Sequence, residues 1–474
     1  MNKYINYIVY VLMLAFSLSS CNDWLDVNPE SQVEGNELFE SESGFKEALA
    51  GVYSGMVNEA TYAKETLYGA YAVLAQEWVN VPTSYQDLVE YNYDATAPTT
   101  LFANIWRNNY NAIANDNNLL KAIDENRSKF SGNNYNIIKG EALALRALLH
   151  FDLLRAFGVS YEVDASKPSI PYSTELSYRV FPQLSVKEVA EKVIADLREA
   201  EQLLKADPIY TGEEIDETVD NGYLMNRTLH LNYYAVKGLQ ARVYMWTKQY
   251  DLARAAAEEV VNSGKFSWAT PGTARQGTNP FPTTTEHLFA LDDVNLSNRV
   301  ESYFNENLNT TSFSLDATTL LEDYDNETSD YRYLYQFASG TNYDYVENRY
   351  STKYWAPSSD AAADANRLPI IRLSEMYLIL SEIDYRNGGT GLDRLNELHQ
   401  ARNVGELTAT DNYYNTLIRE YRREFIGEGQ LFFLYKRLNY ASIIRSDVDP
   451  IAQKIYTFPL PQSETTAAQR EDNR

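Results

Sequence analysis

The sequence predicts a mostly α-helical protein, in which a tetratricopeptide-like helical repeat scaffold is joined to an irregular, loop-rich half. Three observations lead to this fold class. Apolar residues recur at helical spacing through most of residues 41–263. Two neighbouring helices in this region carry the packing pattern of a repeat. The periodicity then breaks down over residues 264–369 and returns before the end of the chain.

Several long helices are expected in the first region. Phe45–Met56 and Leu101–Ile123 carry apolar residues three and four positions apart, which is the pattern of a helix with one buried face. Tyr135–Phe157 is apolar on nearly every side, so we expect it to be buried on most faces. A further helix should begin after Ser185, because Glu188 stands three residues later and completes a capping box.

The repeat pattern is clearest in two helices that a very short turn separates, His230–Thr247 and Tyr250–Asn262. Small and apolar residues occupy the positions at which the two helices of a tetratricopeptide repeat pack together. Such repeats usually stack side by side and share one continuous core. The packing residues are Ala241, Tyr244, Ala253 and Val260.

The second region, residues 264–474, begins with about a hundred residues that are rich in Pro, Gly, Asn, Thr and Tyr. A long irregular segment inside a helical chain is more often functional than a plain linker. It holds one short piece with strand character, His287–Leu291. Helices are expected again at Leu373–Tyr385, Leu392–Arg402 and Tyr413–Ile426, followed by an extended end at Ile455–Pro461.

The first 20 residues are typical of a lipoprotein signal peptide. Lys3 supplies a positive charge, Ile5–Leu18 is largely apolar, and small residues lead to Cys21, the only cysteine. This pattern matches the lipobox of bacterial lipoproteins, in which the cysteine sulfur is acylated and the mature chain begins at that residue. We therefore expect membrane attachment through a lipid anchor at Cys21, with residues 21–40 as a tether. The alternative is an ordinary signal peptide with an incidental cysteine.

Composition excludes several classes of function. The formal net charge of −25 repels a phosphate backbone, so no nucleic acid partner is expected. One cysteine and four scattered histidines leave no ligand set for zinc or an iron–sulfur cluster, and neither a metal nor a cofactor is predicted. Asp323, Asp325 and Glu327 alternate as in a calcium loop, but Thr328 replaces the glycine that such a loop needs.

One group of charged residues could be mistaken for a catalytic cluster. Its members lie three and four positions apart on the apolar helix over Tyr135–Phe157. This spacing is that of neighbours on one helix face, so structural pairs are expected. The residues are Arg146, His150, Asp152 and Arg155.

Six segments, in order along the chain, together resemble the SusD/RagB family of outer-membrane nutrient-binding lipoproteins of Bacteroidota. Leu431–Arg437 (LFFLYKR) departs from the family's Phe-Asp-Leu and paired arginines, and this departure concerns a contact at a helix end. The six segments are Ser20–Ser31 (SCNDWLDVNPES), Glu141–Gly158 with Ile170–Tyr172, Leu368–Gly388, Leu395–Asn403 (LNELHQARN), Ile418–Gly429 (IREYRREFIGEG) and Thr457–Glu464 (TFPLPQSE).

The resemblance implies a non-catalytic, cell-surface lipoprotein of the cell outer membrane. Such a protein binds an oligosaccharide, or occasionally a peptide, in its irregular half. It passes the ligand to a TonB-dependent, SusC-like transporter, on which it sits as a lid. The resemblance implies no cofactor.

Two segments have the composition of a sugar site, which needs aromatic rings beside amides, carboxylates and arginine. They are Trp78–Tyr93 and Asn298–Phe313, and the resembled family places variable binding loops at both. The alternative for each ring is a place in the core, where most large aromatic residues lie. The candidate ligand-binding residues are Trp78, Asn80, Tyr85, Asp87, Tyr91, Arg299, Tyr303, Phe304 and Asn305.

Two other functions stay open at this stage. A surface-anchored glycoside hydrolase would use two carboxylates, and 66 acidic residues offer many pairs without marking one. An assembly protein would use its repeats to hold other proteins and would bind no ligand. Release of reducing ends from a bound polysaccharide separates the hydrolase from the other two.

Overall fold

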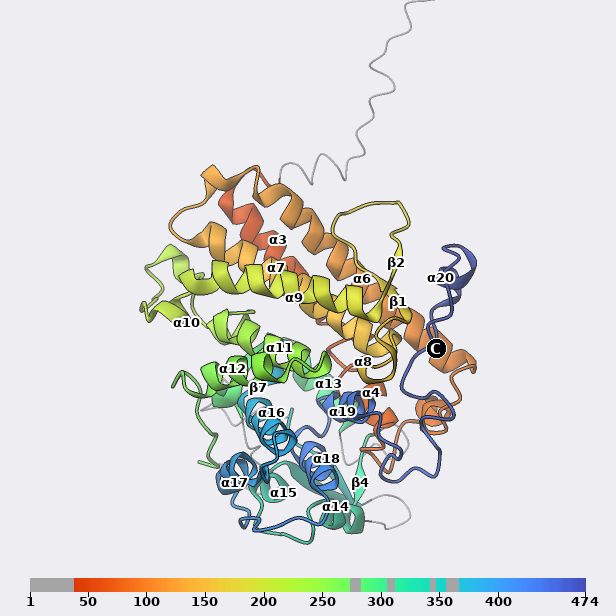
Figure 1. Cartoon of the computed structure of the whole chain (residues 1–474). Helices are drawn as coiled ribbons and strands as arrows, with labels where there is room; N and C mark the ends of the chain where they lie inside the picture. The colour runs from red at the N-terminus through yellow and green to blue at the C-terminus, as the bar shows by residue number, and fades with distance from the viewer. Residues whose placement is uncertain (1–37, 273–282, 305–311, 342–346, 355–365) are drawn as a thin grey trace, which may run out of the picture.

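The computed structural model (Figure 1) describes residues 38–272, 283–304, 312–341, 347–354 and 366–474. The predicted signal peptide, Cys21, the tether up to residue 37 and Asn305 lie outside these residues. Within the described ranges, no helix combines the length and the apolar character that crossing a membrane requires.

Four long helices form the upper part of the molecule in Figure 1: α3 (Glu42–Met56), α6 (Thr96–Ile123), α7 (Asn134–Phe157) and α9 (Val186–Leu203). Each confirms a predicted helix. α7 packs between α6 and α9 and is buried along almost its whole length, as its apolar sequence predicts. Ser185 caps α9 through the expected capping box with Glu188.

The helical stack continues with α11 (Tyr233–Trp246), α12 (Tyr250–Val261), α16 (Leu373–Arg386) and α17 (Leu392–Ala401). Each helix packs on the one before it, and α11 packs on α9. The four predicted repeat residues on α11 and α12 are all buried, because they fill the space between the two helices. The tetratricopeptide-like stack is therefore confirmed. α18 (Tyr413–Glu424) and α19 (Gln430–Leu438) complete the helical part.

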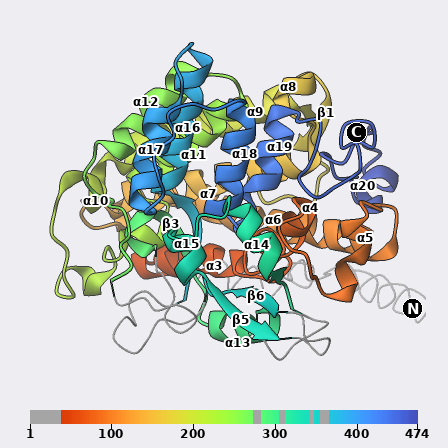
Figure 2. The same cartoon turned by 90° about the horizontal axis from the view of Figure 1, so that it is seen from below.

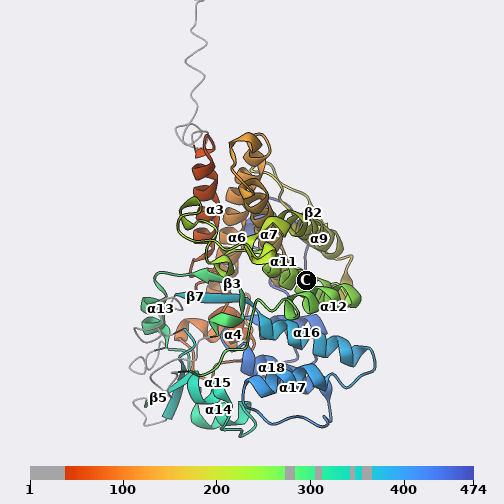
Figure 3. The same cartoon turned by 90° about the vertical axis from the view of Figure 1, so that its left-hand side faces the viewer.

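The irregular part contains short strands on one side of the stack. Figures 2 and 3 show β5 and α13 on the side opposite α12, α16 and α17. β3 (His287–Asp292), the predicted strand, pairs antiparallel with β7 (Arg367–Arg372). A second sheet has the order β4 (Leu315–Asp316), β6 (Glu347–Ser351) and β5 (Phe337–Thr341). Three short helices lie around these strands: α13 (Leu296–Tyr303), α14 (Ala317–Asp323) and α15 (Tyr331–Tyr335).

Shorter elements connect the long helices. β1 (Pro168–Pro171) and β2 (Gln183–Ser185) pair in an antiparallel ribbon beside α9. The remaining α-helices of the described residues are α4 (Ala70–Leu74), α5 (Gln86–Val89), α8 (Tyr161–Asp164), α10 (Pro208–Thr211) and α20 (Gln462–Thr466). Several 3₁₀ turns lie between the helices, and one of them, Thr83–Tyr85, comes directly before α5.

The end of the chain differs from the prediction. Ile455–Pro461 does not form a strand; it consists of a turn and irregular chain. Pro459 and Pro461 have no backbone N–H to donate to a ladder. The segment is held instead by its side chains: Phe458 is fully buried and stacks on Phe102 with a ring separation of 4.2 Å.

The contact at the end of α7 is made despite the unusual sequence of α19. Lys436 Nζ donates to the carbonyl oxygens of Arg155 (2.5 Å) and Gly158 (2.6 Å). These carbonyls lie where a helix has no partner of its own and where its dipole attracts a cation. The lysine therefore closes the C-terminal end of α7, and the next residue, Arg437, pairs with Glu382 of α16.

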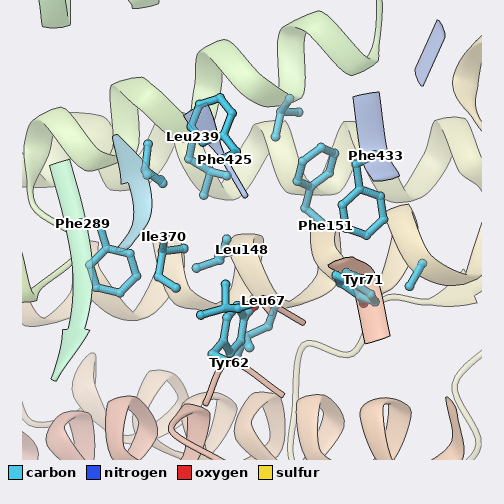
Figure 4. Packing of buried hydrophobic residues seen from close by; sticks show 14 of the residues in the cluster. Tyr62, Leu67, Tyr71, Leu148, Phe151, Leu239, Phe289, Ile370, Phe425 and Phe433 are labelled. Atoms are coloured by element: carbon cyan, nitrogen blue, oxygen red, sulfur yellow. The ribbon is translucent and has the colours of Figure 1, made fainter. Parts of the chain in front are cut away.

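Side chains from both predicted regions share one hydrophobic core. Figure 4 shows Tyr62 and Tyr71, which lie near the start of the described chain, close to Leu148 and Phe151 of α7. Phe433 of α19 belongs to the same cluster. The division at residues 263 and 264 marks a change of local structure, and its status as a domain boundary stays a prediction.

Ion pairs buried under the irregular part hold it against the C-terminal helices. Glu424 of α18 accepts from Arg372 at the end of β7 (2.6 Å) and from Arg402 after α17 (2.7 Å). Arg402 also pairs with Glu286 next to β3 (2.7 Å), and Arg332 of α15 pairs with Glu424 (2.9 Å). All five side chains are almost fully buried, so each charge depends on its partners.

Candidate functional site

A pocket of about 610 Å³ opens at the surface where the two predicted binding segments approach each other. This volume lies in the usual range for a small-ligand site. Its walls are the turns before α4, the 3₁₀ turn before α5, the first half of α6 and the end of α13. We call it the Tyr85–Tyr303 pocket; it is lined by Glu59, Ala60, Lys64, Glu65, Pro82, Ser84, Tyr85, Thr96, Ala97, Thr100, Leu101, Asn104 and Tyr303.

The local sequence explains why these walls are not long helices. Consecutive turns occupy residues 59–69 between α3 and α4, and the side chain of Asn58 accepts from the backbone N–H of Ala60 (2.9 Å) at their start. Pro82 precedes the 3₁₀ turn that ends at Tyr85. Tyr303 is the last residue of α13, and the following Phe304 is buried. Each tyrosine is thus held at the end of a short, anchored element.

The structure brings Tyr85 and Tyr303 to one pocket from positions more than 200 residues apart in the sequence. Tyr303 is half-buried, whereas Tyr85 is buried except for the part that lines the pocket. Both rings pack against Phe313, at centroid distances of 5.3 Å for Tyr85 and 6.0 Å for Tyr303. Both residues were predicted from the sequence as candidate binding residues. The structure adds that they line the same pocket.

Charged groups line the same pocket. Lys64 Nζ lies 3.2 Å from Glu65 Oε1 and 3.3 Å from Glu59 Oε2, and it donates to Tyr303 Oη (3.2 Å). The ammonium group is also 5.0 Å from the centre of the Tyr303 ring. The hydroxyl of Tyr85 donates to Glu65 Oε1 (2.8 Å), and that of Tyr303 donates to Glu59 Oε2 (3.2 Å). Lys64 therefore ties both carboxylates and one aromatic ring together.

Burial and these contacts shift the pKa values of the groups around Lys64. Burial raises the pKa of Glu65, although Lys64 acts in the opposite direction. Partial burial also acts to raise the pKa of Glu59, but Lys64, Tyr303 and Arg299 together outweigh it and the pKa is lowered. Burial and the Glu65 carboxylate raise the pKa of Tyr85, so its hydroxyl keeps the proton that it donates.

Arg299 is placed behind the pocket wall. Its Nη1 atom donates to Glu59 Oε1 and its Nε atom donates to Asp293 Oδ2, both at 2.7 Å. The guanidinium thus holds Glu59 in position from α13 and does not line the pocket.

Two predicted aromatic residues lie in the core beneath the pocket. Trp78 and Phe304 are buried, with rings 5.6 Å apart, and neither lines the pocket. The indole N–H of Trp78 donates to the carbonyl oxygen of Tyr68 (2.9 Å). The expectation that many of these rings pack in the core therefore fits both residues.

Asn80 joins the two halves of the site through a short antiparallel bridge to Ser314. Its backbone N–H donates to the carbonyl oxygen of Ser314 (3.0 Å), and the N–H of Ser314 donates back (3.1 Å). The Asn80 amide also donates to Ser314 Oγ (3.0 Å). Asn80 thus fixes the position of the segment that leads to Tyr85 and does not itself line the pocket.

Asp87 and Tyr91 lie away from the pocket. Tyr91 is buried, donates from its hydroxyl to the carbonyl oxygen of Leu74 (3.0 Å), and has a left-handed backbone with φ of 56°. Asp87 accepts from the side chain of Asn92 (3.2 Å) in the same loop. Both stabilise the loop after α5. Of the nine predicted residues, Asn305 lies outside the described part of the chain.

Sequence analysis missed several residues of the pocket. Glu59, Lys64 and Glu65 lie in turns, and Thr100 and Asn104 lie on the solvent side of α6. None of these residues is aromatic, and the sugar-site composition was expected from aromatic clusters. Charged residues in a stretch without helical periodicity, between the helices ending at Met56 and containing Leu101, were the available signal.

A second, smaller pocket of about 280 Å³ lies between α6 and the connection from β1 to β2. Trp106 and Tyr110 of α6 form one wall, and Phe181 belongs to the connection. In the same connection Tyr178 projects into solvent with 98% of its surface exposed. No binding residue was predicted here.

The charged residues of α7 are engaged in structural contacts. Arg146 pairs with Asp196 (2.7 Å), and His150 Nε2 accepts from the backbone N–H of Ser173 (2.9 Å). Asp152 and Arg155 form the ion pair that their spacing predicts.

In the segment that resembles a calcium loop, the two aspartates are paired with arginines. Asp323 pairs with Arg445 (2.7 Å), and Asp325 pairs with Arg423 and with Arg419 (2.8 Å). Across the ranges that the structure describes, no three carboxylate, histidine or cysteine side chains gather as a metal site would require.

Known proteins match this chain along most of its length. A family model described as "Starch-binding associating with outer membrane" matches residues 23–212, and the SusD family model matches residues 264–443. SusD-like protein P38 of Formosa agariphila is 22% identical over 519 residues, covering 96% of this chain and 95% of that protein.

Solved structures of other proteins share the fold of this chain. A SusD superfamily protein from Bacteroides thetaiotaomicron aligns with a TM-score of 0.72 at 21% identity, over 92% of this chain and all of the other. A SusD-like carbohydrate binding protein from Bacteroides vulgatus aligns with a TM-score of 0.70 at 19% identity, over 90% and 97% of the two chains. The family models on both halves and the shared fold along the chain lead to one conclusion: this protein belongs to the SusD/RagB family.

Proposed function

We propose that this protein is a non-catalytic, cell-surface glycan-binding lipoprotein that captures oligosaccharides in the Tyr85–Tyr303 pocket. One observation carries the proposal: the half-buried ring of Tyr303 lines the same pocket as Tyr85. Lys64 and the carboxylates of Glu59 and Glu65 line it too, and they contact the two tyrosines. A sugar presents apolar CH faces and a rim of hydroxyl groups. A tyrosine ring suits the first, and carboxylate, amide and hydroxyl groups suit the second.

The printed names of relatives support this ligand class. One matching family is described as starch-binding, and a solved relative of the same fold is called a carbohydrate binding protein. Neither name identifies the glycan that this chain binds, because loop geometry sets linkage and sugar specificity.

We further propose a lipid anchor at Cys21 and delivery of the glycan to a TonB-dependent, SusC-like transporter in the outer membrane. The lipobox-like sequence before Cys21 supports the anchor, and the family description refers to association with the outer membrane. Membrane fractionation of cells that carry Cys21→Ala tests the anchor. Recovery of this variant in the outer membrane of cells lacking the transporter would show that lipidation is not needed.

Calorimetry on the unlipidated chain from residue 22, titrated with a panel of plant, fungal and host oligosaccharides, tests the binding function. For a glycan that binds, Tyr303→Ala should weaken affinity by about 1–3 kcal/mol, the usual cost of losing an aromatic anchor. Tyr178→Ala is the matched control, because this ring is exposed and lies outside the pocket.

Three results would contradict the proposal. If Tyr303→Ala binds the glycan as tightly as the control Tyr178→Ala, this pocket is not the binding site. Binding of no glycan in the panel would remove glycan capture by the isolated chain. Release of reducing ends from the bound glycan would indicate a hydrolase, for which Glu59 and Glu65 are the carboxyl groups that line the pocket.

A further inference from the structure

We propose that the Tyr85–Tyr303 pocket selects uncharged glycans and excludes anionic ones, such as uronate-rich or sulfated chains. This inference rests on the proposed glycan-binding function and names the class of glycan. It follows from how the charged side chains around the pocket are already engaged with one another.

The one cationic side chain among the residues that line this described pocket is already engaged with carboxylates. Lys64 Nζ donates to Glu59 Oε2 at 3.3 Å and to Tyr303 Oη at 3.2 Å. It also forms an ion pair with Glu65 Oε1 at 3.2 Å. A sulfate or carboxylate that entered the pocket would have to compete with two carboxylates for this lysine.

The guanidinium of Arg299 is also paired with carboxylates. Its guanidinium donates to Glu59 on one side and to Asp293 on the other, both at 2.7 Å, and it does not reach the pocket surface. Asp293 is almost fully buried, so turning Arg299 toward a ligand would leave a buried carboxylate without its cation. Neither Lys64 nor Arg299 is therefore free to pair with an anionic sugar without giving up a carboxylate partner.

The two tyrosine hydroxyl groups point their protons at carboxylates. Tyr85 donates to Glu65 at 2.8 Å, and Tyr303 donates to Glu59 at 3.2 Å. Each carboxylate still has lone pairs to accept further hydrogen bonds, because a carboxylate offers about four acceptor sites. The charged part of the wall thus offers acceptors to a ligand.

A neutral sugar matches this wall. Its hydroxyl groups donate to the carboxylate oxygens in charge-assisted hydrogen bonds, which are stronger than neutral ones. An anion brings its own acceptors against Glu59 and Glu65 and loses hydration without gaining a donor. Discrimination therefore comes from a repulsive wall as well as from attractive contacts.

The test is calorimetry on the unlipidated chain from residue 22 with matched hexasaccharides of both classes. The neutral probes are cello-, xylo-, manno- and malto-hexaose; the anionic probes are hexagalacturonate and a carrageenan hexasaccharide. We expect the anionic probes to bind at least about tenfold more weakly than the best neutral probe, which corresponds to one lost charge-assisted hydrogen bond. The affinity for the neutral probe should not change with ionic strength.

Glu59→Gln tests the mechanism. It removes the negative charge that pairs with Lys64 and Arg299 and that lines the pocket, so affinity for hexagalacturonate should rise by about tenfold. The matched control is Glu301→Gln on α13, which makes the same change of net charge at an exposed position outside the pocket. The control should gain no affinity. Thermal unfolding followed by circular dichroism checks that both variants fold.

The outcomes separate this inference from the proposed function. An anionic probe that binds as tightly as the neutral ones, with Tyr303→Ala abolishing the binding, overturns the charge selection and leaves the glycan site in place. An equal gain for Glu59→Gln and Glu301→Gln overturns the role of Lys64. Failure of every probe in the panel, neutral and anionic, counts against the proposed function itself.

Discussion

At the scale of single residues, Glu141 carries a buried charge that folding must keep paired. This α7 carboxylate is fully buried, and Arg227 Nη2 donates to its Oε1 atom at 2.6 Å. His230 Nδ1 lies 2.9 Å from its Oε2 atom, to which the Tyr53 hydroxyl donates at 2.8 Å. Burial acts to raise the pKa of Glu141, but Arg227 and His230 outweigh it and lower the pKa to about 2.

This shift makes stability depend on pH. The pKa is depressed in the folded state, so Glu141 contributes stability above its ordinary pKa near 4.5 and loses it as the pH falls toward 2. The full contribution is about 3 kcal/mol at neutral pH, since each pKa unit corresponds to about 1.4 kcal/mol. Glu141→Gln should therefore lower the free energy of unfolding at pH 7 and have a smaller effect at pH 3.

Urea unfolding of the native protein and of Glu141→Gln at both pH values measures this difference. Glu162→Gln is the control, because that carboxylate is exposed on α8 and pairs with an exposed lysine. A loss that is the same at pH 7 and pH 3 would show that packing, not the charge, accounts for the effect.

Other residues show where sequence reasoning reaches its limit. Trp78, Tyr91 and Tyr303 have similar sequence surroundings, rich in aromatic and amide residues, yet only Tyr303 lines the pocket. Aromatic residues suit a core and a sugar site equally well, so composition does not separate the two roles. An aromatic ring can contact a ligand only if it reaches the surface. Whether it does so depends on elements that are distant in the sequence and pack over it.

At the scale of elements, α18 connects most of the irregular part to the helical stack. Glu420 and Glu424 lie one turn apart on this helix and face Arg332, Arg372 and Arg402, which come from α15, β7 and the end of α17. Burial acts to raise the pKa of Glu424, but the arginines outweigh it and hold the pKa well below its ordinary value. Buried ion pairs thus add to the apolar contacts that join these elements.

Glu424→Gln should destabilise the protein by about 3–5 kcal/mol, because three buried arginines lose their shared carboxylate. Denaturant unfolding measures the loss. Glu397→Gln, in an exposed pair on α17, should change stability by less than about 1 kcal/mol. A loss no larger than that of Glu397→Gln would show that the buried arginines do not need this carboxylate.

Elements with strong local signals were predicted well. The capping box of α9 and the continuous apolar sequence of α7 are local, and both elements formed as expected. Ile455–Pro461 was predicted as extended because Pro-x-Pro is typical of extended chain, but no neighbouring strand is available to pair with it. The pocket is the opposite case, since Glu59 and Tyr303 meet only after the chain has folded.

At the scale of the whole molecule, the two predicted regions depend on each other. Arg242 of α11 lies before residue 264, and its partner Glu375 of α16 lies after it, with both nitrogen–oxygen distances at 2.7 Å. α12 packs on α16 across the same division. The apolar core likewise includes side chains from both sides.

The mature chain should therefore unfold in one cooperative transition, whereas residues 41–263 alone should not fold cooperatively, because α11 and α12 would lose the surface that covers them. Scanning calorimetry of both proteins, with circular dichroism of the fragment, is the measurement. A fragment with its own sharp transition would instead establish residues 41–263 as an independent domain.

The short bridge between Asn80 and Ser314 affects how this pocket can change over evolution. It joins Asn80, ahead of Tyr85, to Ser314, while α6 and the end of α13 supply other parts of the walls. Added residues between Tyr85 and α6 would change one wall without moving this bridge, because surface loops tolerate added length. Changes in that loop can therefore reshape the pocket while the helices keep their positions.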